Sequence, residues 1–197
     1  MNPSPAPRLV LASTSPFRRE LLARLQIDFV VANPQVDETA LAGEGPAQTA
    51  ERLALLKARA VVGQFPQALI IGSDQVAYCG DAVYGKPGSR DKARDQLARM
   101  RGRTVLFHTA VCLLNAATGQ SQCRGVPTEV VFRDYADAEI ERYLDKEDAL
   151  NCAGSAKAEG LGIALMAALR GDDPNALIGL PLIALCQMLR NEGVALP

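Results

Sequence analysis

The chain has 197 residues, 48% of them hydrophobic and 22% charged, which is enough apolar material to bury a core. Its formal net charge is −1, which argues against a protein held on nucleic acid mainly by bulk charge. A single histidine and the lack of tryptophan argue against a histidine-rich zinc site and a broad aromatic platform for single strands.

Five cysteines are scattered along the chain without a Cys-x-x-Cys pair. An odd number at such wide spacing is typical of reduced thiols in a cytosolic protein. The first apolar run has four residues, too few for the core of a signal peptide, and no apolar run reaches the roughly 18 residues that span a membrane. We therefore expect a soluble, cytoplasmic protein without a membrane partner.

Strands and helices are predicted to alternate at the start of the chain. The apolar run Leu9–Ala12 predicts a buried strand, and a polar turn follows it. Ser15 is placed to cap a helix that begins at Pro16. A polar loop over 33–45 precedes the second helix. The elements expected here are a strand over 9–12, a helix over 16–25, a strand over 28–32, a helix over 46–64 and a strand over 68–73.

Two long alternating runs, with a turn over 116–119 between them, predict a hairpin in the middle of the chain. A loop rich in small residues covers 151–162, and we expect a helix after it that reaches residue 170. The other expected elements are strands over 75–79 and 82–84, a helix over 89–100, strands over 104–115 and 120–132, and helices over 137–146 and 181–191. This order predicts an α/β fold, a single domain over 1–197 with a central mixed β-sheet flanked by helices.

The first strand–helix junction contains cations where a helix disfavours them. Arg18 and Arg19 lie in the first helical turn, where each opposes the helix dipole by roughly 0.3–1 kcal/mol. Ser13 lies in the turn just before. A hydroxyl-rich turn and an arginine at a helix N-terminus are typical of a phosphate-binding cradle. The alternative is an ordinary capped surface helix, because the glycine-rich loop of known P-loops is missing.

Two lysines are candidates for the same anion site. Lys57 falls on the apolar stripe of the second predicted helix, whose other members are residues 50, 53, 54, 58 and 61. It either extends along the helix to water or is aimed at a phosphate group. Lys86, in the motif GKP at 85–87, either belongs to a surface turn or joins the site.

Two acidic residues complete the candidate site. Asp74 follows the apolar run 68–73, and the carboxyl ends of buried strands are where open α/β sheets place ligands. Glu38 stands beside Asp37 in the polar loop, as a solvated acid or as a ligand of a divalent cation. Together these residues predict a polyanion site, although spacing alone leaves open whether they converge.

Several motifs resemble those of one enzyme family. The segment LASTSPFRRELL at 11–22 resembles the opening signature of the Maf family of nucleotide pyrophosphatases. The further matching motifs are VDET at 36–39, Lys57 in LLKA, GSDQV at 72–76, GKP at 85–87 and the glycine-rich stretch near 154–162. The resemblance implies an α/β fold with a central mixed sheet of the ITPase-like kind. It also implies hydrolysis of a nucleoside triphosphate to the monophosphate and diphosphate, with a divalent cation such as Mg or Mn, in a chain that often forms dimers.

Three features resemble the branch of the family that hydrolyses 7-methyl-GTP. They are Phe17 after Ser-Pro, Gln75 after Asp74, and the segment CAGSAKAEGLG at 152–162, which contains Glu159. N7-methylation makes guanine cationic, so an aromatic face attracts it and a carboxylate accepts strengthened hydrogen bonds from its edge. Gln75 would read a further edge. The aromatic residue of that branch is often tryptophan, so Phe17 is a mild departure.

We therefore predict a house-cleaning hydrolase that converts 7-methyl-GTP to 7-methyl-GMP and diphosphate, with the nucleotide as its partner and no nucleic-acid polymer. The alternatives are a dTTP/UTP pyrophosphatase on the same scaffold, or a non-catalytic nucleotide-binding regulator linked to cell division. A regulator would be expected to lack a catalytic residue, and none is lost here. The predicted catalytic residues are Asp74, Glu38, Lys57 and Lys86, the predicted substrate contacts are Ser13, Arg18, Phe17, Gln75 and Glu159, and the predicted metal ligands are Glu38 and Asp74.

Overall fold

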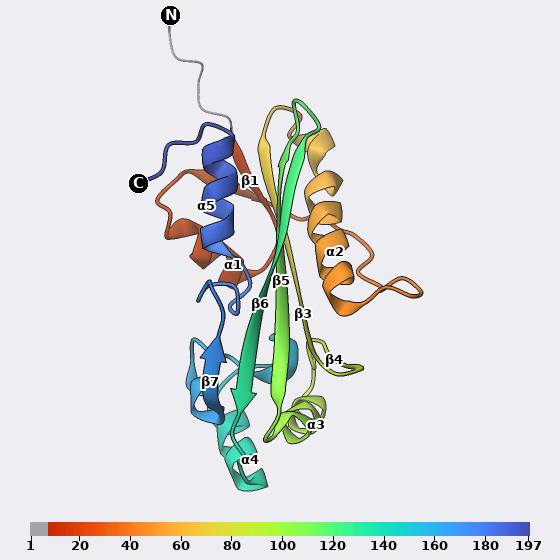
Figure 1. Ribbon diagram of the computed structural model, residues 1–197, viewed down its shortest axis with the longest axis vertical. Helices are drawn as coiled ribbons and strands as arrows, with labels where there is room; N and C mark the ends of the chain where they lie inside the picture. Colours follow the sequence, from red (N-terminus) through yellow and green to blue (C-terminus); the bar gives the residue numbers. More distant parts are fainter. Residues whose placement is uncertain (1–7) are drawn as a thin grey trace, which may run out of the picture.

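The computed structural model describes residues 8–197, whose strands form one seven-stranded mixed sheet (Figure 1). The strand order is β2-β1-β3-β5-β6-β7, and β4 pairs with β3 at its far end. β1 pairs in parallel with β2 and β3, and all other pairs are antiparallel. The strands are β1 Leu9–Ala12, β2 Phe29–Ala32, β3 Leu69–Cys79, β4 Ala82–Tyr84, β5 Thr104–Asn115, β6 Ser121–Phe132 and β7 Met166–Arg170. The predicted mixed sheet is confirmed.

Helices cover both faces of this sheet. Figure 1 shows α2 on one side of the sheet and α1 and α5 on the other. The helices α3 and α4 lie at the end of the long β5–β6 hairpin that is away from its turn. Leucines of α1 and α5 pack on β1, β3 and β5, while alanines of α2 pack on the other face of β3 and β5. The α-helices are α1 Pro16–Ala23, α2 Pro46–Ala60, α3 Arg90–Met100, α4 Asp137–Lys146 and α5 Leu182–Asn191. Short 3-10 turns lie at Val62–Gln64, Ala153–Ser155 and Leu161–Leu165.

The start of α1 follows the predicted capping chemistry. The Ser15 hydroxyl accepts a hydrogen bond from the backbone N–H of Arg18, and Pro16 stands in the first helical turn. The helix after residue 162 is a wrong prediction. A 3-10 turn occupies Leu161–Leu165, and β7 then pairs antiparallel with β6. An open edge of a sheet supplies the hydrogen bonds that make this segment a strand.

Asp74 lies within a strand, which corrects its predicted place at a strand end. β3 continues through Asp74 because β5 pairs with it without interruption from Leu69 to Tyr78. What ends there is the neighbour on the other side: β1 stops pairing with β3 at Ile71, and β4 begins pairing with it at Ala77. On that side, in the described part of the chain, the five intervening residues of β3 have no strand beside them. Asp74, Gln75 and Val76, three residues of this gap, line a cleft.

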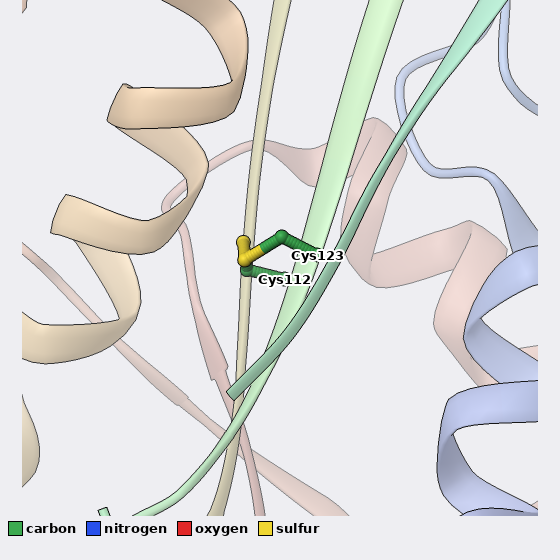
Figure 2. The surroundings of a disulfide bond; sticks show 2 residues. All are labelled: Cys112 and Cys123. Carbon is green, nitrogen blue, oxygen red and sulfur yellow. A yellow bond between two sulfur atoms is a disulfide. The ribbon is translucent and has the colours of Figure 1, made fainter. Parts of the chain in front are cut away.

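Two cysteines form a disulfide, which contradicts the prediction of reduced thiols throughout. Cys112 on β5 and Cys123 on β6 stand directly opposite each other across the hairpin, with Cα atoms 4.1 Å apart (Figure 2). Their separation of 11 residues in the sequence does not match a disulfide motif, and only the register of the hairpin brings the two cysteines together. Cys79, Cys152 and Cys186 are free thiols.

Within residues 8–197, the structure contains no helix with the length and apolar character needed to cross a bilayer. Residues 1–7 lie outside the described part of the chain, so a domain that spans all of 1–197 stays a prediction.

Candidate active site

A cleft of about 980 Å³ lies beside the gap along β3. Its walls come from the β1–α1 turn, the loop after β2, α2, β3, the loop after β4 and the loop before β7. All the residues that the sequence placed in the site line this one cleft: Ser13, Phe17, Arg18, Glu38, Lys57, Asp74, Gln75, Lys86 and Glu159. The fold therefore supplies the convergence that sequence spacing left open.

A glycine on β3 determines how closely α2 approaches Asp74. A Cβ at Gly72 would clash with the carbonyl oxygen of Ala54 and lie 2.9 Å from the backbone nitrogen of Ala58. The helix thus packs directly on the strand, with Ala54 and Ala58 fully buried. Lys57 stands between these two contacts and reaches Asp74, two residues along β3 on the same face of the sheet.

Lys57 joins two carboxylates at the centre of the cleft. Its ammonium lies 2.6 Å from Asp74 Oδ1 and 2.8 Å from Glu38 Oε1. The Lys57 and Asp74 side chains are only 6% and 9% exposed, whereas Glu38 is 57% exposed. Lys57 therefore does not extend to water, and that alternative is wrong. Burial raises the pKa of Glu38, but the hydrogen bond and charge of Lys57 outweigh it and hold the pKa below its usual value.

Arg18 and Ser13 form a second polar group at the N-terminus of α1. The Arg18 guanidinium donates to the carbonyl of Gly179 at 2.8 Å and to the Ser13 hydroxyl at 3.5 Å. Burial lowers the pKa of Arg18, and the nearby charges of Asp74 and Glu38 oppose that shift. The guanidinium is thus oriented by neutral acceptors, while its charge faces the two acids.

Three predicted base-reading residues line the same cleft. Phe17 is partly exposed at the start of α1, Glu159 is exposed on the loop before β7, and Gln75 is partly exposed on β3. The ammonium of Lys157 lies 5.9 Å from the centre of the Phe17 ring. Lys86 is exposed on the loop after β4, and its charge contributes to the lowered pKa of Glu38.

The segment 176–179, which no sequence motif marks, forms a wall of the cleft. The Gln75 amide nitrogen donates to the carbonyls of residues 176 and 177 and to the Thr109 hydroxyl, at 2.8–3.1 Å. The Thr109 hydroxyl donates to the carbonyl of residue 176, and the Ser73 hydroxyl to that of residue 179. The Gln75 amide nitrogen is therefore occupied, which leaves its Oε1 as the polar atom available to a ligand. These partners are 34–106 residues apart, and no local pattern signals them.

A second missed group orients the loop that carries Glu38. Arg52 on α2 forms two hydrogen bonds to the Glu44 carboxylate, at 2.7 and 2.8 Å, and donates to the carbonyl of Thr39 at 3.0 Å. Glu44 in turn accepts the backbone N–H of Leu41 and the hydroxyl of Thr49. These bonds tie the loop to α2 on both sides of its Gly43 turn, close to Glu38.

The donor set at the centre of the cleft fits a divalent cation held jointly with a ligand. Glu38 and Asp74 approach one point, which the Lys57 ammonium marks. No cluster of three or more histidine, cysteine or acidic side chains with metal-binding spacing exists within residues 8–197. Magnesium typically takes one or two carboxylates and completes its shell with water and phosphate oxygens. Two carboxylates that line the cleft match that requirement, and the cation would compete with the Lys57 ammonium for them.

Comparison with known proteins assigns the chain to a family. Residues 8–192 match the family model described as "Maf-like protein". The chain belongs to this family. Maf-like relatives include a "7-methyl-GTP pyrophosphatase" of Aromatoleum aromaticum, 60% identical over 96% of this chain and 98% of the relative. Proteins with the same description from Cupriavidus pinatubonensis and Methylobacillus flagellatus are each 58% identical. They cover 98% and 95% of this chain and 97% and 98% of their own lengths.

Among solved structures, "The structure of the Staphylococcus aureus Ham1 protein" is similar to this Maf-like chain with a TM-score of 0.46 and 14% identity. The matched region covers 64% of this chain and 72% of the Ham1 chain.

Proposed function

We propose that the chain is a nucleoside triphosphate pyrophosphatase that hydrolyses 7-methyl-GTP to 7-methyl-GMP and diphosphate. The observation that carries the proposal is the cleft, in which a buried ammonium between two carboxylates adjoins a wall formed by Phe17, Gln75 and Glu159. Relatives that are 58–60% identical over nearly the whole chain carry the name of this activity.

The cationic residues are suited to the triphosphate. Arg18 and Lys57 approach the centre of the cleft from α1 and α2, and Lys86 lies on the loop after β4. Fixed cations of this kind stabilise the negative charge that moves onto the leaving diphosphate. Lys57 would donate its third N–H to a phosphate oxygen, because its ammonium has three donors and the two carboxylates engage two of them.

Asp74 is the proposed proton acceptor. It is 9% exposed and its position is fixed by Lys57, so its carboxylate is oriented before the substrate enters. Glu38 and Asp74 would hold a divalent cation, Mg or Mn. When bound, such an ion neutralises phosphate charge and lowers the pKa of a bound water. Asp74 would take the proton of the attacking water, and Glu38 would remain a charged ligand because its pKa is lowered.

The other wall is suited to a cationic purine. The Phe17 ring supplies a face for the methylated base, worth roughly 0.5–2 kcal/mol. Glu159 would accept the N1–H and exocyclic amine of guanine, whose acidity the positive ring increases. Gln75 presents an acceptor oxygen, because hydrogen bonds to the segment 176–179 and Thr109 occupy its amide nitrogen. A pyrimidine would lack the purine donors that these two acceptors require.

The test is product analysis after incubation of the protein with 7-methyl-GTP, GTP, dTTP and UTP, each with Mg²⁺, with Mn²⁺ and with excess chelator. We expect diphosphate and monophosphate from 7-methyl-GTP with the highest kcat/KM, and no turnover in chelator. Preferential hydrolysis of dTTP or UTP would replace the proposal with a pyrimidine enzyme. Binding without hydrolysis of any nucleotide would indicate a regulator.

The proposed binding partner of the chain is its nucleotide substrate. A homodimer and a cytoplasmic location remain predictions, and light scattering coupled to size exclusion would test the first.

A further inference from the structure

The loop that carries Glu159 is anchored to α4 by one carboxylate. Glu147, which follows the last residue of α4, accepts the Lys157 ammonium on Oε1 and the backbone N–H of Leu161 on Oε2, both at 2.8 Å. These two contacts stand on either side of Glu159 in the sequence. One side chain therefore holds both ends of the five-residue segment that presents the proposed base-reading acid.

The loop packs closely against α4 and Glu147. The Tyr143 hydroxyl, one turn earlier on α4, accepts the backbone N–H of Lys157 at 3.1 Å. A Cβ at Gly160 would clash with the Glu147 carboxylate, and a Cβ at Gly162 would lie 2.6 Å from the Lys157 carbonyl oxygen. The glycines therefore permit the approach of the loop to Glu147, which is only 14% exposed.

Lys157 is the one cation of this segment, and its ammonium is paired with Glu147 rather than with Glu159. It is bound to Glu147 and lies 5.9 Å from the Phe17 ring centre. Glu159, two residues further on, is exposed in the cleft and forms no hydrogen bond or ion pair with any residue in 8–197 that the structure describes. The hydrogen bond and charge of Glu147 raise the pKa of Lys157, and the charge of Glu159 adds to this shift. Besides Glu147, Glu159 is the carboxylate whose charge acts on this ammonium, so it is the expected partner when Glu147 is neutralised.

We propose that Glu147 is a positioning residue for base recognition: it binds Lys157 and so keeps the Glu159 carboxylate free for the purine edge. This inference rests on the proposed function of the cleft. Neutralising Glu147 would release the Lys157 ammonium to pair with Glu159. The acceptor for the cationic base would then be occupied by a cation of the chain itself, and discrimination between 7-methyl-GTP and GTP would fall.

The test compares kcat/KM for 7-methyl-GTP and GTP in four forms: wild type, Glu147→Gln, Lys157→Met and the double variant. Glutamine keeps an acceptor for the Leu161 N–H but loses the charge that holds Lys157. We expect Glu147→Gln to lower kcat/KM for 7-methyl-GTP about tenfold, mainly through KM, and to change GTP much less. In the double variant no ammonium remains to pair with Glu159, so we expect the preference to return to within about threefold of wild type.

The double variant separates this role from a purely structural one. If Glu147 only held the loop in place, removing both partners would do at least as much damage as Glu147→Gln alone, and the absence of rescue would overturn the proposal. Glu141→Gln is the matched control, because Glu141 is on the same helix and pairs with Arg90 and Arg94 away from the cleft.

Binding of the product 7-methyl-GMP, measured by calorimetry, gives a readout without turnover, and the same pattern of loss and rescue is expected. A wild-type enzyme that prefers 7-methyl-GTP, with Glu147→Gln retaining that preference, would overturn the positioning role and leave the proposed function standing. A wild type without any preference for the methylated base would overturn both.

Discussion

Replacing Lys57 by methionine removes the charge at the centre of the cleft and nearly preserves the volume of the side chain. Truncating one partner of a buried ion pair costs about 3–5 kcal/mol, because the other charge is left without compensation. Here Glu38 is 57% exposed and can turn to water, and the cleft admits water to the nearly buried Asp74. We therefore expect Lys57→Met to lower the free energy of unfolding by about 2–3 kcal/mol in chelator.

The assay is thermal unfolding with chelator and with excess Mg²⁺. For a chain of this length, a loss of about 2–3 kcal/mol lowers Tm by about 4–12 °C. A cation at roughly ten times its Kd restores about 1.4 kcal/mol. Mg²⁺ should stabilise the variant more than the wild type, in which Lys57 competes for the two carboxylates. Lys92→Met, at an exposed position of α3, is the control and should change stability by less than about 0.5 kcal/mol.

Equal Tm values for wild type and Lys57→Met in chelator would refute the argument that Asp74 depends on the ammonium for its stability in the fold. A larger Mg²⁺ effect on the wild type would refute the competition between Lys57 and the cation for the two carboxylates.

The other predictions concern catalysis, base recognition, acid stability and the cysteines. Asp74→Asn should stay folded by circular dichroism and lower kcat about 10²- to 10⁴-fold, and unchanged diphosphate release would exclude it as the base. Glu159→Gln should lower kcat/KM for 7-methyl-GTP by about 5- to 150-fold and that for GTP less; equal losses would count against base reading. Hydrogen bonds from Arg52 and the Leu41 N–H hold the pKa of Glu44 at about 2, below its usual 4.5. The stability that Glu44 adds over Glu44→Gln should therefore be full above pH 4.5 and disappear toward pH 2 in unfolding curves; a constant difference would contradict this. Thiol titration of the denatured, unreduced protein should find three free cysteines and five after reduction, whereas five before reduction would exclude the Cys112–Cys123 bond.

Local chemistry determined most of the elements and pointed to the charged residues at the centre of the site, whereas Phe17, Gln75 and Glu159 were predicted only from the family resemblance. The Ser15 cap and Pro16 start α1 through contacts within one turn, and the apolar stripe around Lys57 is a property of the helix itself. Arg18 and Lys57, which disobey local preferences, both line the cleft, because a ligand site tolerates charge where helix and core disfavour it. Arg19, which also opposes the helix dipole, is exposed outside the cleft lining.

Tertiary structure decided which partner each of these residues has. Whether Lys57 met water, phosphate or carboxylate depended on the closeness of α2 to Gly72, and the pattern of the helix contains no information on that distance. The same holds for β3, which continues past Asp74 because β5 pairs with it, and for β7, which is a strand because the edge of β6 was open. Cys112 and Cys123 are opposite only in the register of the hairpin. Hydrogen bonds and ion pairs between distant segments depend on the positions of both partners in space, whereas a sequence pattern records the preference of only one of them.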